Sequence, residues 1–117
     1  MIPGRVFQVV GSDNHPRIIL SHPKNGRFLV CNVSDAKKCP RSPCLCYPSD
    51  HEFIVKESGI PFEYLTTLPC SGYESAKKAK TIRISEMPFP HQKLKIICEA
   101  ALKATSVSEI YKKYLRD

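Results

Sequence analysis

Residues 15–34 read HPRIILSHPKNGRFLVCNVS, and this stretch decides the fold. Two apolar runs, Arg17 to Ser21 and Phe28 to Val33, flank a loop that contains Asn25-Gly26. Asn-Gly is the strongest short turn signal because both residues tolerate positive φ. The stretch therefore predicts a β-hairpin.

The pairing register of this hairpin depends on the length of its loop. If Asn25 and Gly26 form a two-residue turn, Lys24 pairs with Arg27, and Arg17 then lies opposite Ser34. The sequence leaves this register open beside a second one.

In the second register the loop runs from Pro23 to Gly26, so that His22 pairs with Arg27 and Arg17 lies opposite Asn32. The two registers differ by an even number of positions, and strand side chains alternate between faces. Either register therefore gathers four polar side chains on one face at the open end of the hairpin: His15, Arg17, Asn32 and Ser34.

The composition is that of a basic globular protein. The chain has 117 residues, and 18 Lys and Arg against 11 Asp and Glu give a net charge of +7. We expect a single domain over residues 1–117. The charge favours a polyanionic partner such as nucleic acid through counterion release, although small basic proteins without such a partner are common. No apolar run is long enough to span a membrane, and the six cysteines without a signal peptide predict reduced thiols and a cytoplasmic protein.

Further strands and two helices follow from the pattern of apolar residues. Strands are predicted over residues 2–10, 44–47, 51–55, 60–68 and 81–85, and residues 69–80 are predicted as a polar loop with a solvated basic patch. Helical spacing of apolar residues predicts helices over 91–104 and over 106–115, the second capped by Ser106. Strands followed by helices predict an α+β domain with a small, strongly bent antiparallel sheet or barrel.

Residues 35–50, DAKKCPRSPCLCYPSD, are a surface excursion of the kind that tends to carry function. Cys39, Cys44, Cys46 and His51 are sufficient in number for zinc, but the spacing lacks the usual paired knuckle. A thiol–imidazole pair with His51 is a further alternative, although no oxyanion motif accompanies it. We expect neither a metal nor a cofactor.

The string PRIILS, a turn and then FLVCNVSDAKK resembles the MazF/PemK/Kid toxins, whose second strand carries an Arg-Pro motif ending in Ser and whose third strand ends in Thr or Ser. Gly4 to Val10 fits the family's first strand, and TIRISEM leading to a C-terminal helix fits its ending. The segment CLCYPSDHEFI resembles the corresponding segment of a more divergent branch of this fold. The resemblance implies an SH3-like barrel of the PemK or CcdB type.

The resemblance also implies a toxin of a toxin–antitoxin pair, a homodimer that cuts single-stranded RNA without metal and is silenced by an acidic antitoxin. Ser34 takes the place of the family's hydroxyl residue. His15 stands where the family has its arginine before proline, and Arg17 lies two residues later on the same face. Arg5 replaces the family's acidic residue after the first Gly.

Metal-free RNA cleavage needs a base, a group that stabilises the charged phosphorane, and an acid. Histidine suits the proton transfers and arginine suits the phosphate. We therefore predict Arg17, Ser34, His51 and His15 as catalytic residues, with Asp50 orienting His51. The predicted substrate-binding residues are Asn32, Lys37, Lys38 and Arg41. The alternative interpretation is a non-catalytic module of the same fold, which binds nucleic acid or protein with its basic surface.

Overall fold

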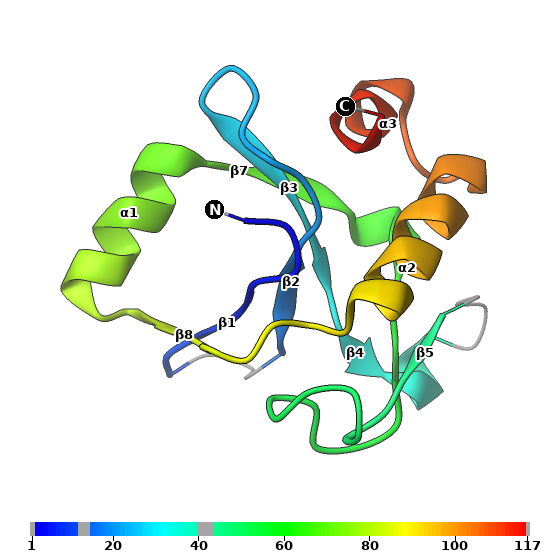
Figure 1. Cartoon of the computed structure of the whole chain (residues 1–117), viewed down its shortest axis with the longest axis horizontal. Coiled ribbons are helices and arrows are strands. Elements are labelled where there is room, and N and C mark those ends of the chain that lie inside the picture. The colour runs from blue at the N-terminus through cyan, green and yellow to red at the C-terminus, as the bar shows by residue number, and fades with distance from the viewer. Residues whose placement is uncertain (1, 12–14, 40–43, 117) are drawn as a thin grey trace.

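The computed structural model describes residues 2–11, 15–39 and 44–116. Its elements in chain order are β1 (Val6–Val9), β2 (Arg17–Ile19), β3 (Arg27–Asn32), β4 (Ser34–Asp35), η1 (Ala36–Lys38), β5 (Leu45–Cys46), β6 (Ser58–Gly59), η2 (Phe62–Tyr64), β7 (Thr66–Pro69), α1 (Cys70–Ala79), β8 (Ile82–Ile84), α2 (His91–Lys103) and α3 (Glu109–Leu115) (Figure 1). The predicted α+β class is confirmed.

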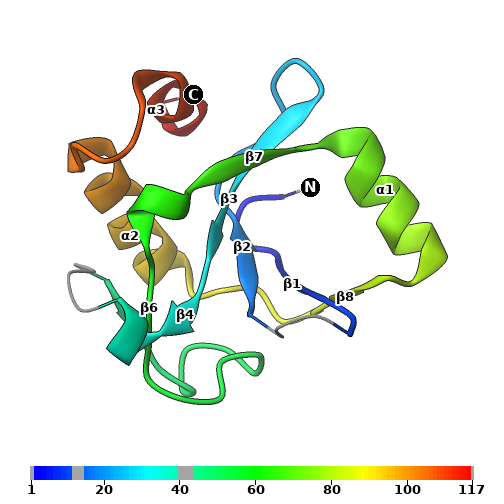
Figure 2. The same ribbon diagram turned by 180° about the vertical axis from the view of Figure 1, so that it is seen from behind.

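The strands form two antiparallel sheets. The larger has the order β7-β3-β2-β1-β8, and the smaller has the order β4-β6-β5. Figure 2 shows β4 and β6 of the smaller sheet side by side below α2. The described strands do not close into a barrel.

The predicted hairpin is confirmed as β2 and β3, and it combines both registers. Arg17 pairs with Asn32 within the strands, whereas an isolated bridge joins Lys24 to Arg27 at the turn. Asn25 and Gly26 both have positive φ, at 52° and 76°, as the Asn-Gly signal requires. Between the two registers, the segment that follows β2 therefore contains more residues than the facing part of β3, which makes a bulge.

Ser21 bridges this change of register. Its side chain is buried, and its hydroxyl accepts the Leu29 backbone N–H at 2.9 Å. The preceding residue still follows the strand register, because the Leu20 N–H donates to the Leu29 carbonyl at 2.8 Å. A side-chain oxygen thus replaces a missing backbone acceptor beside the bulge.

The larger sheet is apolar on both faces because each face is covered. On one face, side chains such as Ile18 and Leu29 form a core with Ile97 and Ala101 of α2. On the other face, a smaller core contains Phe7, Ile19, Phe28, Val30 and Tyr73 of α1. Figure 1 shows α1 on the opposite side of the molecule from α2 and α3.

The loop predicted over residues 69–80 is wrong, because Cys70–Ala79 form helix α1. The helix joins β7 to β8, which lie at opposite edges of the larger sheet. Its end is marked by Lys80, which has φ 59° and donates its N–H to the carbonyls of Ala76 and Lys77. Only Tyr73 of this helix is buried, so its sequence lacks the apolar stripe that normally reveals a helix.

Two predicted strands also differ from the structure. Residues 51–55 form turns and coil rather than a strand, and residues 60–68 divide into η2 and the start of β7. The short strand predicted near Cys46 and the strand near Ile84 are confirmed as β5 and β8.

The helix predicted over 91–104 is confirmed as α2, and the last helix begins later than predicted. Ser108, not Ser106, caps α3, and its hydroxyl accepts the Tyr111 N–H at 3.3 Å. Within the described ranges, no helix has the length and apolar character that crossing a membrane requires.

Candidate functional site

The open end of the β2–β3 hairpin brings Arg17 and Asn32 together. The two residues are directly paired, and the Arg17 Nε donates to Asn32 Oδ1 at 3.1 Å. Both side chains are half-buried, and Arg17 lies opposite Phe7 on its other neighbour, β1. This bond fixes one edge of the guanidinium. Among the residues that the structure describes, no acceptor occupies the two Nη groups, which form the fork that binds a phosphate.

His15 lies next to this pair along the chain. Pairing of the hairpin extends past β2, because the Val33 N–H donates to the Pro16 carbonyl at 2.8 Å. His15 precedes that last pair and is half-buried. The backbone therefore holds His15 at the same end of the sheet as Arg17.

Ser34 belongs to the second sheet rather than to the hairpin. It begins β4 and pairs with Gly59 of β6. Its hydroxyl hydrogen-bonds the Cys39 thiol, whose pKa is raised mainly by burial and lowered in part by this bond. The Ser34 hydroxyl is thus engaged by a thiol, whereas the Arg17 guanidinium bonds Asn32, so in the described part of the chain no hydrogen bond joins Ser34 to Arg17.

His51 is sealed inside the protein. Its side chain is 0% exposed, its Nδ1 accepts the Phe53 backbone N–H at 3.0 Å, and its Nε2 lies 2.7 Å from the Met87 carbonyl oxygen. Because Nδ1 accepts, Nε2 carries the proton and donates it to that carbonyl. Both ring nitrogens are used in tying two segments together, so we leave His51 out of the proposed site.

Asp50 does not orient His51 as predicted. Its Oδ2 accepts the Tyr47 N–H at 2.8 Å and also accepts from Lys93 Nζ at 2.9 Å. The carboxylate therefore closes the turn that starts at Tyr47 and anchors this turn to α2.

Lys37 and Lys38 are exposed on η1, directly after β4, while Arg41 lies outside the described residues. The Asp35 carboxylate begins η1 by accepting the Lys37 N–H at 3.0 Å, and it also pairs with Lys56 at 2.9 Å. These two donors, Lys56 first, lower the pKa of Asp35.

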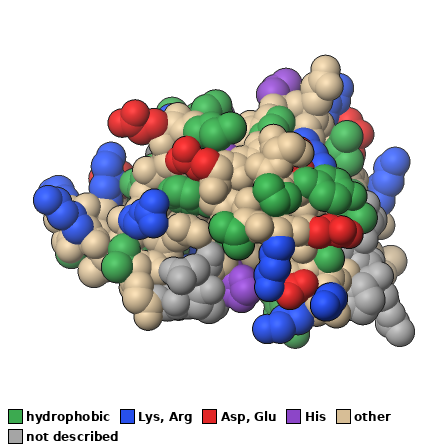
Figure 3. Space-filling model, turned by 90° about the horizontal axis from the view of Figure 1, so that it is seen from below, with side chains coloured by type: hydrophobic (Ala, Val, Ile, Leu, Met, Phe, Trp, Pro, Cys, Tyr) green, Lys and Arg blue, Asp and Glu red, His purple; other side chains and the backbone are tan. Residues whose placement is uncertain are grey.

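Figure 3 views the molecule from the end at which β2 begins. Lys and Arg side chains lie at both ends of this face, including over α1. A His side chain lies at the edge of the face between them. Asp and Glu side chains are interspersed, so the basic groups do not form one unbroken patch.

The six cysteines are free thiols. Burial raises the pKa of Cys46 to about 12 and that of Cys98 to about 11, and it raises the pKa values of Cys31, Cys39 and Cys44 as well. A thiol with a raised pKa is a poor nucleophile at neutral pH, which argues against the cysteine-hydrolase alternative.

The geometry of the described residues does not support the zinc alternative either. Among the residues that the structure describes, no three His, Cys, Asp or Glu side chains gather as a metal site. His51, the predicted fourth ligand, has both ring nitrogens in hydrogen bonds to the protein backbone.

The structure contains a pocket that the sequence did not predict. Its lining includes Arg5, Tyr73 and Lys77, and two of these residues belong to the helix that was predicted as a loop. Tyr73 is the single aromatic residue in an otherwise polar stretch, and this was the available signal of a buried anchor.

Comparison of the chain with protein-family models, with curated proteins and with solved structures finds no match. The proposed function is therefore argued from the side chains of this protein and their geometry.

Proposed function

We propose that this protein is a metal-independent endoribonuclease of the MazF/PemK type, which binds single-stranded RNA at the open end of the β2–β3 hairpin. The observation that carries the proposal is the Arg17–Asn32 hydrogen bond of 3.1 Å, which orients a guanidinium at the end of a sheet. The net charge of +7 supports a polyanionic substrate.

In the proposed reaction, the ribose 2′-hydroxyl attacks the adjacent phosphorus and the bond to the 5′-oxygen breaks, which leaves a 2′,3′-cyclic phosphate. Arg17 stabilises the charge on the phosphorane oxygens through its fork of N–H donors. His15 transfers protons, because an imidazole exchanges protons near neutral pH. Asn32 positions Arg17 and does not touch the reacting atoms.

The second candidate is a non-catalytic module that binds nucleic acid or protein with the same surface. A specific finding favours it: His51 is sealed and the Ser34 hydroxyl is engaged by Cys39, so neither of these two predicted catalytic side chains is placed to act on RNA. RNA binding through Arg17 is common to the enzyme and to a nucleic-acid-binding module.

The resemblance to the toxin family extends the proposal to assembly and partners. We propose that this domain, whose two open sheets would correspond to an SH3-like barrel that is not closed, forms a homodimer that an acidic antitoxin protein holds inactive in the cytoplasm. The supporting features are the basic charge and six free thiols.

Expression in bacteria tests the proposal. We expect growth arrest that Arg17→Ala relieves and Arg27→Ala does not. Arg27 is a matched control because it lies on β3 at the turn end of the same hairpin and also bonds across to a neighbour, from Nε to Thr67 Oγ1 at 2.9 Å. Harmless expression of folded wild-type protein would favour the binding module.

A further inference from the structure

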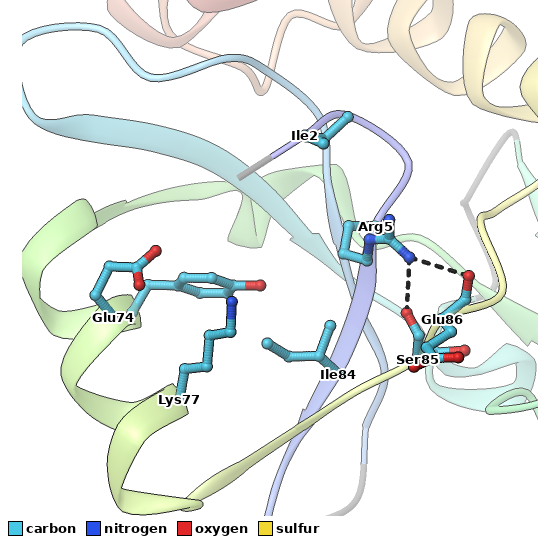
Figure 4. Close-up of a pocket in the computed structure, with 8 residues that line it drawn as sticks. Ile2, Arg5, Glu74, Lys77, Ile84, Ser85 and Glu86 are labelled. Carbon is cyan, nitrogen blue, oxygen red and sulfur yellow. Dashed lines mark hydrogen bonds between the residues drawn. The ribbon is translucent and has the colours of Figure 1, made fainter.

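A pocket of about 410 Å³ lies between the N-terminal segment, α1 and β8. Figure 4 shows Arg5 on one side of it, Lys77 on the other and Ile84 between them. Ile2 and Ile84 supply apolar wall, and the remaining lining is polar or charged. The volume falls within the range of small-molecule sites, roughly 300–1,000 Å³, and is more than a lone phosphate group fills.

Arg5 is held in place from one side. Its Nη1 donates to the Ser85 carbonyl at 3.1 Å and to the Glu86 carbonyl at 3.0 Å, as the dashed lines in Figure 4 show. These two bonds anchor a single nitrogen to the segment that follows β8. Within the described ranges, Nε and Nη2 remain as donors on a guanidinium whose orientation is already fixed.

Tyr73 brings a hydroxyl to the same pocket from α1. Its ring is packed edge-on against Phe7 and Phe28, with centroids at 5.5 and 5.4 Å, so the phenol is held rigidly. Burial raises the pKa of Tyr73, and the phenol is therefore a neutral donor at physiological pH. In the described residues this hydroxyl makes no hydrogen bond within the protein.

Lys77 follows Tyr73 by one helical turn, so both side chains project from the same face of α1. Figure 4 shows its amino group directed from the helix toward the interior of the pocket. A guanidinium, an ammonium and a phenol thus reach one space from two separate segments. This donor set suits a tetrahedral oxyanion.

Two carboxylates also line the pocket. Glu74 lies at the end away from Arg5, and Glu86 lies beyond Arg5 near the end of β8 (Figure 4). Carboxylates repel a free polyanion but accept hydrogen bonds from hydroxyl or amino groups. A ligand that combines one anionic group with such donors satisfies both halves of the lining.

We propose that this pocket binds a phosphate monoester of a hydroxyl-bearing organic molecule, such as a nucleoside monophosphate. The phosphate lies between Arg5 and Lys77 and accepts a hydrogen bond from the Tyr73 hydroxyl. The organic part lies against Ile2 and Ile84. The site is separate from Arg17 and does not depend on RNA cleavage.

Isothermal titration calorimetry of the full chain tests this site with adenosine monophosphate, adenosine and inorganic phosphate. Lys77→Gln removes the ammonium, and Tyr73→Phe removes the hydroxyl while keeping the packed ring. Lys78→Gln is the matched control, since Lys78 carries the same exposed charge on the same helix without lining the pocket. We expect the monophosphate to bind the wild type, and each pocket variant to bind about tenfold more weakly, as the loss of a charge-assisted or phosphate hydrogen bond predicts.

Three results would overturn the proposal: no binding of the monophosphate at millimolar concentration, equal binding of adenosine, or equal weakening by Lys78→Gln. The source of the phosphate is decided by comparing RNA that bears a 5′-phosphate with RNA that bears a 5′-hydroxyl, in the Arg17→Ala background. A Lys77-dependent preference for the phosphorylated end assigns the pocket to RNA termini. Equal binding of the two RNAs, with the mononucleotide bound, assigns it to small metabolites.

Discussion

Arg17 and Asn32 face each other across β2 and β3, and the 3.1 Å bond from Arg17 Nε to Asn32 Oδ1 joins them at the open end of the hairpin. The turn end of the same hairpin carries a comparable arrangement, in which Arg27 donates to Thr67 through Nε and Nη2, both at 2.9 Å. The two arginines differ in setting, because Arg27 is exposed and uses two of its nitrogens on Thr67. Arg17 is half-buried, and no acceptor in the described part of the chain occupies its Nη fork.

RNA affinity should depend on Arg17 more than on Arg27. For Arg17→Ala we expect about tenfold weaker binding of a labelled single-stranded RNA, and a salt dependence shallower by about 0.7, because one phosphate contact is lost. Asn32→Ala should weaken binding less, since the charge remains and only its orientation is lost. Fluorescence anisotropy at several salt concentrations measures both quantities. Equal losses in Arg17→Ala and Arg27→Ala would show that the surface binds RNA without a defined site.

Ser21→Ala should destabilise the fold. The Leu29 N–H would lose its acceptor in a buried place, at a cost of about 1–2 kcal/mol in the free energy of unfolding. Ser49→Ala is the control, because Ser49 is exposed in the turn that Asp50 closes. Urea denaturation measures both variants. An unchanged midpoint for Ser21→Ala would mean that water or another oxygen replaces the hydroxyl.

His51→Ala should cost about 3 kcal/mol of unfolding free energy, from the cavity and from two backbone groups that lose their partners. His22→Ala should have little effect, because His22 is exposed beside the hairpin turn. Thermal and urea unfolding provide the comparison. A loss of RNA cleavage in a His51 variant of wild-type stability would restore this residue to the catalytic site and contradict the structural role.

Stability should fall at alkaline pH because of the buried thiols. The pKa values of Cys98 and Cys46 are raised to about 11 and about 12 from an ordinary value of 9.0. Between about pH 9 and 11 the unfolded chain loses these protons while the folded chain keeps them, so the folded state binds more protons and is destabilised as pH rises. The slope that one such thiol contributes is at most about 1.4 kcal/mol per pH unit, where the unfolded thiol is fully deprotonated and the folded thiol is still protonated.

Cys46→Ala separates this effect from the titration of other groups. Its unfolding free energy should be lower at pH 7 but should decline less steeply from pH 9 to 11 than that of the wild type. Urea unfolding at a series of pH values gives the two slopes. Parallel slopes would show that the Cys46 thiolate is tolerated in the folded protein.

The hairpin and α2 could be predicted because their signals are local. Asn25 and Gly26 adopt the positive φ values that their chemistry allows, and the apolar residues of α2 recur at helical spacing toward Ile97 and Ala101. The pairing of Arg17 with Asn32 was one of two registers that the sequence left open. The structure uses both registers, because the bulge at Ser21 lets the strands and the turn pair differently.

The features that escaped prediction depend on distant parts of the chain. Helix α1 buries little besides Tyr73, and its position follows from its link between two sheet edges. The role of His51 depends on the Met87 carbonyl, and that of Ser34 on a two-residue strand around Gly59. None of these partners is marked by periodicity or by a motif, so the hydrogen bonds of His51 and Ser34 could not be predicted from residue type alone.

The central claim is that Arg17 takes part in cutting RNA without a metal, and incubation of pure protein with end-labelled single-stranded RNA in EDTA tests it most directly. We predict cleavage by the wild type and by Arg27→Ala, products with 2′,3′-cyclic phosphate ends, and no cleavage by a folded Arg17→Ala variant. Intact RNA after incubation with the wild type, or equal cleavage by Arg17→Ala, would contradict it.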